Sequence, residues 1–440
     1  MNKFLSFDLT TEIKCWRKEV DRRSTLKKIN YSDGFTIKGS GLSYVGSFIP
    51  PIHKGKVIDY SPANLIINFD ETNRTVTVLT GITLGDLFNF LACKGLYLPV
   101  QPGHPDISIG GCIASCVHGK NQFKDGTFRS YVKELELFHP KYGYIYCDSK
   151  TNSDIFELTI GGYGSTGIIT KATLFTKLIS SNAYKTDVID IKTIDLIIPT
   201  MLKLLKKPNC DYVYGVLDLN RSKTIKSFLL SSTEEAGVMN NFDLSTQIIK
   251  KKFFSRSRPI YKCLYTKMTS SLAFIYLFYN SKKTKISLFE NLFPAAKNMT
   301  YYKLFGSSGF IEKQLIIPLV KFDEFLDCLW QLIKLSKIAI PLCTIKIFKK
   351  TPYAGLLRFD FDGVCITIDT EKTDESTKFF KKLDQMALRF SSHTCLYKYS
   401  LSSRSLVNQE YGEEFLKFKK KLSLFDSNNI FKSSFTDKIF

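Results

Sequence analysis

The sequence predicts an α+β protein in which a strand-rich N-terminal domain precedes a domain that alternates strands with helices. Three observations support this prediction. The chain has 440 residues, which is more than a single hydrophobic core usually contains, so two or three domains are expected. Short β-branched and aromatic runs divided by glycine turns fill its first part, and helical periodicity dominates only later. We therefore expect domains at residues 1–180, 181–400 and 401–440.

The clearest elements of the N-terminal part are a hairpin, a helix and a strand after a glycine turn. Residues 69–79 are predicted to form a β-hairpin whose turn lies at 71–74. Residues 83–95 are predicted to form a helix that ends at a glycine, because its large apolar residues fall on one face. The glycines of 161–170 predict a turn that leads into another strand.

The later part of the chain mixes both periodicities. Helices are predicted at 193–207, 319–337 and 375–392. Strands are predicted between them at 211–219, 312–319, 344–350 and 363–370. This alternation favours an antiparallel sheet covered by helices on one face, and the residues after 400 are predicted to be helical again.

The composition is that of a packed globular chain with a basic surface. Hydrophobic residues make up 44% of the chain, and the net formal charge is +21. The lysines are dispersed among acids and no nucleic-acid-binding motif appears, so we expect no nucleic-acid partner. A surface that is merely rich in lysine is the favoured interpretation of the charge, and attraction to an anionic membrane or a phosphorylated substrate is the alternative. The apolar run 270–280 is too short to span a bilayer, so we expect a buried helix or strand there.

The cysteines and the first residues bear on location. Eleven cysteines are scattered without a disulfide framework. Asp8, Glu12 and Lys14 interrupt any secretory signal, so we expect free thiols in a reducing compartment. The expected location is the cytoplasm, with peripheral contact at the inner membrane as the alternative.

The segment 101–128 gathers two histidines and two cysteines, His104, Cys112, Cys116 and His118. Their spacing contains no CxxC or HExxH, so we expect no metal site. A Cys116–His118 nucleophile is equally weak, because in a strand the two side chains would point the same way without an orienting third group. Cys112 is expected to be a small buried residue.

Four glycine-rich segments give a stronger signal. They lie at 37–47, 101–111, 110–120 and 161–170. Glycine, serine and threonine let a ligand approach the backbone closely, which suits a pyrophosphate. None of the four matches the GxGxxG of a Rossmann turn or the lysine-containing P-loop.

A family resemblance is carried by GSGLSY at 39–44, LPVQPG at 98–103, SIGGCIASCVHGKNQFKDGTF at 108–128 and TIGGYGSTGIITKATL at 159–174. In these segments the chain resembles the FAD-linked oxidases of the vanillyl-alcohol oxidase/p-cresol methylhydroxylase superfamily. The His-Gly-Lys-Asn tetrad is similar to the branch that contains ribose 2′-oxidases of polyprenyl-phosphate sugars. Beyond residue 180 the resemblance is limited to the short segments 312–318, 348–350, 363–369 and 396–404.

The resemblance implies a fold and a cofactor. It implies a two-lobed PCMH-type FAD-binding domain, a cap domain whose antiparallel sheet covers the flavin, and C-terminal helices that pack back on the first domain. The residues that it assigns to FAD binding are Gly39, Ser40, Gly41, Leu42, Ser43, Tyr44, Pro102, Gly103, His104, Ser108, Gly110, Gly111, Cys112, Ser115, His118, Gly119, Asn121, Gly126, Gly162, Gly164, Gly167 and Ile168.

The resemblance also implies a reaction. A secondary alcohol of a sugar, in this branch linked to polyprenyl phosphate, would be oxidised to a keto-sugar by hydride transfer to flavin N5. A partner keto-reductase would then complete an epimerisation in cell-envelope polysaccharide synthesis. Lys120 would lie where substrate and flavin meet, and Gln314 and Lys349 would line the sugar pocket. Lys398 is the nearest counterpart of a C-terminal active-site lysine.

Three positions depart from the family pattern. Leu42 stands where covalent members can carry a histidine, so we expect non-covalent FAD, with a link through His104 or His393 left open. Thr367 stands where the ribose-oxidase branch has a cysteine. Glu312 stands where a glutamine is expected. The last two departures concern the sugar pocket and not the redox chemistry.

Two other functions remain open. The first is an aldonolactone or alditol oxidase that acts on a soluble sugar and passes electrons to oxygen. The second is a basic binding protein that uses a degenerate flavin fold to bind nucleic acid or a membrane. The His-Gly-Lys-Asn tetrad favours the oxidase of polyprenyl-phosphate sugars over the first alternative. The second would be favoured by a colourless purified protein that binds polyanions with a steep salt dependence.

Overall fold

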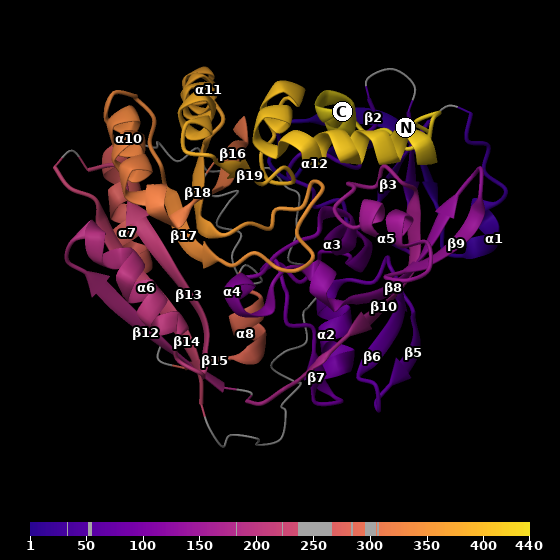
Figure 1. Cartoon of the computed structure of the whole chain (residues 1–440), viewed down its shortest axis with the longest axis horizontal. Helices are drawn as coiled ribbons and strands as arrows, with labels where there is room; N and C mark the ends of the chain where they lie inside the picture. Colours follow the sequence, from indigo (N-terminus) through magenta and orange to yellow (C-terminus); the bar gives the residue numbers. More distant parts are fainter. Residues whose placement is uncertain are drawn as a thin grey trace.

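The computed structural model describes residues 1–32, 34–51, 55–181, 183–221, 223–235, 266–282, 285–294, 305 and 308–440. Figure 1 shows two halves side by side: the N-terminal residues with the C-terminal helices in one, and an eight-stranded sheet with its helices in the other. Within the described part of the chain, no helix is long and apolar enough to cross a membrane.

Two sheets build the N-terminal half. The first has the order β1-β2-β4-β3, with β2 and β3 both parallel to β4. The second is antiparallel, with the order β5-β6-β10-β8-β9. The strands are β1 (Asn2–Leu5), β2 (Glu12–Glu19), β3 (Phe35–Lys38), β4 (Lys56–Asp59), β5 (Ile66–Asp70), β6 (Thr75–Leu79), β8 (Val132–His139), β9 (Gly143–Asp148) and β10 (Ile168–Phe175). The predicted hairpin is confirmed as β5 and β6.

Helices α2 (Leu84–Ala92) and α3 (Ile109–Ser115) pack into the core beside the five-stranded sheet. Helix α2, predicted from its apolar face, begins where the Thr83 hydroxyl accepts a hydrogen bond from the Asp86 N–H at 3.1 Å. Helix α3 ends at Cys116, whose φ of 45° is left-handed. The expectation that Cys116 lies in a strand is therefore wrong.

Short elements complete this half of the molecule. They are α1 (Arg23–Leu26), α4 (Gln122–Asp125), α5 (Ser153–Thr159) and the paired strands β7 (Leu96–Tyr97) and β11 (Lys177–Leu178). Strand β11 lies at the junction with the second half, because β12 begins a few residues after it, and β7 lies there because it pairs with β11.

The second half is built on one antiparallel sheet with the order β15-β12-β14-β13-β17-β18-β16-β19. Its strands are β12 (Ala183–Ile191), β13 (Cys210–Asp218), β14 (Lys226–Glu234), β15 (Lys285–Ser287), β16 (Phe310–Ile317), β17 (Leu342–Phe348), β18 (Gly363–Glu371) and β19 (His393–Thr394). Helices α6 (Ile197–Leu205), α10 (Phe322–Lys334) and α11 (Asp374–Leu388) cover its outer face (Figure 1). The predicted strands and helices of this part are confirmed.

Strand alternation gives this sheet two different faces. Odd-numbered residues of β17, such as Cys343 and Ile345, pack under the outer helices, and so do even-numbered residues of β18, such as Ile366. The opposite parity points toward the N-terminal half and carries polar residues, among them Lys346 and Thr367. The polar inner face is therefore available to a ligand.

The apolar run at 270–280 belongs to α7 (Lys267–Asn280), which packs on the inner face through Phe274, Leu277 and Phe278. It is a helix, but it is less buried than expected. Tyr276 is 67% exposed and Leu272 is 57% exposed. The short helix α8 (Leu288–Leu292) packs nearer the N-terminal half.

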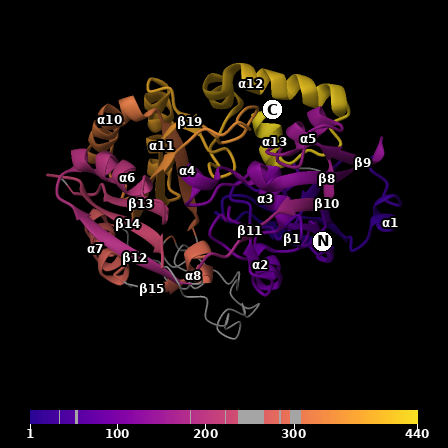
Figure 2. The same ribbon diagram turned by 60° about the horizontal axis from the view of Figure 1, so that its bottom comes forward.

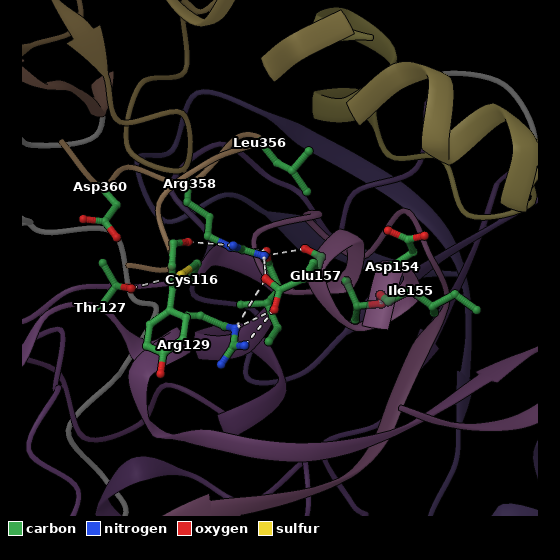
Figure 3. Close-up of polar contacts among 12 residues, drawn as sticks. Cys116, Thr127, Arg129, Asp154, Ile155, Glu157, Leu356, Arg358 and Asp360 are labelled. Carbon is green, nitrogen blue, oxygen red and sulfur yellow. Dashed lines mark hydrogen bonds and ion pairs between the residues drawn. The ribbon is translucent and has the colours of Figure 1, made fainter. Parts of the chain in front are cut away.

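The C-terminal helices α12 (Arg404–Phe425) and α13 (Ser434–Ile439) lie against the N-terminal half, with α12 beside α5 (Figures 1 and 2). The loop 349–362 also crosses to that half. Figure 3 shows Glu157 of α5 between Arg129 and Arg358, at 2.7 Å and 2.6 Å respectively. This cluster fixes the loop after β17 to the N-terminal domain.

Candidate active site between the two halves

A cavity of about 360 Å³ lies between glycine-rich loops of the N-terminal domain and the inner face of the eight-stranded sheet. Its volume falls within the usual range of small-molecule sites. The N-terminal wall comes mainly from residues 39–44, 101–111 and 117–120. The wall contributed by the sheet consists of Glu312, Gln314, Leu342, Thr344, Lys346, Thr367 and Asp369.

Two glycines let separate loops of the N-terminal wall meet. A Cβ on Gly39 would lie 2.1 Å from Ser108 Oγ, and a Cβ on Gly119 would lie 2.3 Å from Asn121 Oδ1 and 3.2 Å from the Gln101 carbonyl oxygen. At these distances no larger residue fits without displacement of the neighbouring loop. Small hydroxyl-bearing residues line this wall: Ser40, Ser43, Ser47, Ser108 and Ser115.

His118 links the two walls. Its Nε2 lies 2.8 Å from Gln314 Oε1 and its Nδ1 lies 3.1 Å from the Gly119 carbonyl oxygen. Gln314 Nε2 in turn donates to Thr367 Oγ1 at 2.8 Å. Burial, aided by the charge of Lys346, lowers the pKa of His118 to about 3. The ring is therefore neutral at physiological pH, and its single N–H donates a hydrogen bond either to Gln314 Oε1 or to the Gly119 carbonyl oxygen.

Lys120 projects from the N-terminal wall toward two tyrosines of β13. Its Nζ lies 4.0 Å from the ring centroid of Tyr212 and 5.7 Å from that of Tyr214. Burial and the neighbouring charge of Lys346 lower the pKa of Lys120 to about 7, against the opposing charge of Asp211. A substantial fraction of the amine is consequently unprotonated near neutral pH.

A second group of charges lines the cavity near Tyr44. Lys398 Nζ lies 3.3 Å from Glu312 Oε1 and 3.6 Å from the ring centroid of Tyr44. Asp369 is directly opposite Glu312 across β18 and β16. Burial, followed by the charge of Glu312, raises the pKa of Asp369 well above its usual range.

Three of the four predicted catalytic residues, Lys120, Gln314 and Lys398, line the cavity. Lys349 does not, which corrects its expected place. Strand β17 ends at Phe348, and Lys349 is exposed on the loop that follows. Lys346, three residues earlier on the inward face of the strand, lines the cavity instead.

Most residues assigned to FAD binding also line the cavity. They are Gly39, Ser40, Gly41, Leu42, Ser43, Tyr44, Pro102, Gly103, His104, Ser108, Gly110, Gly111, Ser115, His118, Gly119, Gly164 and Gly167. Of the two histidines considered for a covalent link, His104 lines the cavity, whereas His393 stacks on Phe361 at 3.5 Å between ring centroids and lies outside the lining.

Five assigned residues lie outside the lining, each for a local reason. Cys112 is fully buried in the hydrophobic core, and Ile168 points away from the cavity while its neighbour on the strand faces it. The Asn121 side chain donates hydrogen bonds to its own loop. Gly126 packs against the loop after β17, and Gly162 packs against the end of α5.

Sequence reasoning missed Lys346 and Asp369 as site residues and recognised Glu312 only as a departure from the family. Alternation within predicted strands placed each of them on one of two faces but did not say which face is inward. Even-numbered residues of β17 and odd-numbered residues of β18 lie on the same face, because the two strands pair Lys346 with Cys365 and Thr344 with Thr367. That register was the missing information.

The segment 18–146 matches a family model described as an FAD binding domain. Decaprenylphosphoryl-beta-D-ribose oxidase of Mycolicibacterium smegmatis is 36% identical over 121 residues, which are 27% of this chain and 26% of that protein. A D-lactate dehydrogenase of Anaerostipes hadrus is 30% identical over 144 residues, which are 32% of this chain and 30% of that protein. A glycolate oxidase subunit of Bacillus subtilis is 33% identical over 141 residues, 31% of this chain and 30% of that subunit. The chain thus covers between about a quarter and a third of these three relatives.

The matched segment contains the N-terminal wall of the cavity from Gly39 to Lys120. The close approach of Gly39 to Ser108 leaves a cradle of small residues and hydroxyl groups, which fits the pyrophosphate of FAD. The cofactor of this protein is FAD. Residues 18–146 form an FAD-binding domain, and over this part the chain is similar to FAD-linked oxidoreductases.

Proposed function

We propose that the protein oxidises a secondary alcohol of a sugar, carried on a polyprenyl phosphate, to a keto-sugar. The observation that carries this proposal is the position of Lys120, an enclosed amine between the glycine-rich wall and the polar wall of the sheet. Bound FAD would supply the hydride acceptor for the carbinol carbon. Proton uptake and substrate binding fall to side chains of this chain.

Lys120 is suited to take up the hydroxyl proton. A general base works best when its pKa lies near the working pH, and burial with Lys346 brings the pKa of Lys120 to about 7. Tyr212 and Tyr214 contact the amine and hold it at the cavity wall. His118 is a poorer candidate, because burial lowers its pKa to about 3 and its ring nitrogens already face Gln314 and a carbonyl.

The sheet side of the cavity supports a substrate with several hydroxyl groups. Gln314, Thr344 and Thr367 supply amide and hydroxyl groups that both donate and accept hydrogen bonds. Glu312 and Asp369 add carboxyl oxygens. A sugar ring offers several hydroxyl groups to this wall, and a small monofunctional alcohol would leave carboxyl oxygens of Glu312 and Asp369 without a donor.

The lipid phosphate and the partner are further parts of this proposal. The net charge of +21 would draw the protein toward anionic polyprenyl phosphate at a membrane surface. The ribose oxidase among the relatives carries a decaprenylphosphoryl sugar in its name, which supports this substrate class. A keto-reductase would consume the keto-sugar to complete an epimerisation.

A 2-hydroxy acid is the second candidate substrate. The names of a D-lactate dehydrogenase and a glycolate oxidase subunit among the relatives support it. Lys120, Lys346 and Lys398 line the cavity and would attract a carboxylate. The carboxyl groups of Glu312 and Asp369 weigh against it, because they would repel a small anion in the same space.

Anaerobic reduction of the bound flavin distinguishes the two candidates. The purified protein is mixed with polyprenyl-phosphate ribose, with free pentoses and pentitols, and with D-lactate, and the visible flavin band is followed. The proposal expects bleaching with the pentose derivatives and none with D-lactate. Bleaching by D-lactate alone would replace the sugar with a 2-hydroxy acid.

A further inference from the structure

We propose that Glu312 and Asp369 together bind two neighbouring hydroxyl groups of the substrate, and that this diol subsite selects a polyol over a 2-hydroxy acid. The inference rests on the proposed function and names the part of the cavity that recognises the sugar. It concerns residues of the sheet, outside the segment that matches the FAD-binding model.

The backbone holds the two carboxyl groups side by side. Glu312 of β16 and Asp369 of β18 are direct partners in the antiparallel register, so their side chains leave the sheet on the same face. Both residues line the cavity. Glu312 is 2% exposed and Asp369 is fully buried. Two acids at such neighbouring positions in a sheet repel each other, so their presence requires a compensating contact.

Protein contacts leave this pair largely unsatisfied. Among the described residues, Glu312 Oε2 and both carboxyl oxygens of Asp369 are buried with no donor from another residue, and their one hydrogen bond is the contact that the two acids make with each other through a shared proton. Lys398 reaches only Glu312 Oε1, at 3.3 Å. Buried polar atoms without partners are uncommon in native structures and are costly. A shared proton satisfies one of these contacts, and the carboxyl oxygens that remain without a donor at the cavity indicate a ligand that donates hydrogen bonds.

A vicinal diol has the required chemistry. Each hydroxyl group donates one hydrogen bond, and two hydroxyl groups on neighbouring carbons can reach two adjacent carboxyl groups at once. Charge repulsion between the acids leaves a proton on the pair, because burial and the charge of Glu312 raise the pKa of Asp369. When a diol binds, that proton can turn from the hydrogen bond between the two acids to a hydroxyl oxygen, so the pair can both accept from and donate to the diol.

The same pair explains how the cavity would reject a 2-hydroxy acid. The carboxylate of such an acid has no proton to donate, and it would face the charge that the pair retains. Lys398 cannot offset this repulsion fully, because it is already paired with Glu312. Replacement of both acids by amides would leave Lys346 and Lys398 unopposed and would make the cavity attractive to an anion.

The test compares binding of xylitol and of D-lactate by isothermal titration to the FAD-loaded protein. The variants are Glu312→Gln, Asp369→Asn and their double replacement. The control is Asp190→Asn, which makes the same acid-to-amide change at an exposed position of β12 in the same sheet. Flavin content and melting temperature establish that each variant is folded, and the amides preserve side-chain size.

We expect the unmodified protein and the Asp190→Asn control to bind xylitol at least tenfold more tightly than D-lactate. The double variant should bind xylitol at least tenfold more weakly and D-lactate more tightly. Unchanged xylitol affinity in the folded double variant, with flavin reduction by pentitols intact, would overturn the diol subsite and leave the proposed function standing. Binding and turnover of D-lactate with no binding of xylitol by the unmodified protein would overturn both.

Discussion

Replacement of Lys120 by arginine separates its charge from its capacity to accept a proton. Arginine keeps a positive charge at the cavity wall and a contact with Tyr212, but it does not lose its proton at any pH that the protein tolerates. We expect the Lys120→Arg protein to hold FAD normally and to lose most of its activity. Lys120→Ala should behave similarly in turnover.

The magnitude follows from the environment of the amine. Burial and Lys346 lower the pKa of Lys120 to about 7. The neutral fraction then rises from roughly one tenth at pH 6 to roughly nine tenths at pH 8, so the rate should rise about tenfold over that interval. The sign is an increase with pH, because the unprotonated form is the active one. Loss of a positioned general base costs about 100-fold to 10,000-fold in rate.

The assay is stopped-flow reduction of the flavin under anaerobic conditions, with saturating pentitol, between pH 5.5 and 9. The unmodified protein should show a single rise near neutrality that both variants lack. A rate independent of pH across this range, or a Lys120→Arg protein within threefold of the unmodified rate, would refute the role of Lys120 as proton acceptor.

Three further outcomes are expected. Acid precipitation should release yellow FAD to the supernatant, and colour retained in the pellet would show a covalent link. Gly39→Ala should lower the molar ratio of flavin to protein, because its Cβ would lie 2.1 Å from Ser108 Oγ. A second change, Ser108→Ala, should restore part of that ratio. A normal ratio in the Gly39→Ala protein would contradict the tight contact between the two loops. Glu157→Gln should lower stability by about 2 kcal/mol at pH 7, measured by denaturant unfolding, because Arg129 and Arg358 lose a shared carboxylate. Burial alone would raise the pKa of Glu157, but these arginines outweigh it and lower the pKa. The stability difference between the variant and the unmodified protein should therefore vanish as the pH falls through that lowered pKa. A stability difference that persists in acid would indicate packing instead of charge.

The elements that local patterns determine could be predicted from the sequence. The hairpin of β5 and β6 is set by its turn, and the outer helices are set by apolar faces. Helix α3 could not be predicted, because its glycines and cysteines give no helical pattern and its ends are defined by the folded backbone, at the Ser108 cap and the left-handed Cys116. The exposure of α7 also could not be predicted, since its apolar residues extend all the way round the helix.

The candidate site also has one wall that local sequence patterns predict and one wall that they do not. Glycine-rich loops identify the FAD wall by composition, since small residues are needed wherever loops and cofactor meet closely. The sheet wall depends on pairing between strands far apart in the chain. The choice of Lys346 over Lys349 depends on where β17 ends, and the pairing of Glu312 with Asp369 depends on the register of β16 with β18. Neither the end of β17 nor the register of β16 with β18 is determined by a local sequence pattern.

The most direct test of the central claim is an anaerobic titration of the purified protein with a pentose derivative, followed through the visible flavin spectrum. We expect a yellow protein whose flavin band bleaches with the sugar alcohol and recovers its colour with an added electron acceptor. A colourless protein that takes up no added FAD, or a flavin that only a 2-hydroxy acid reduces, would contradict it.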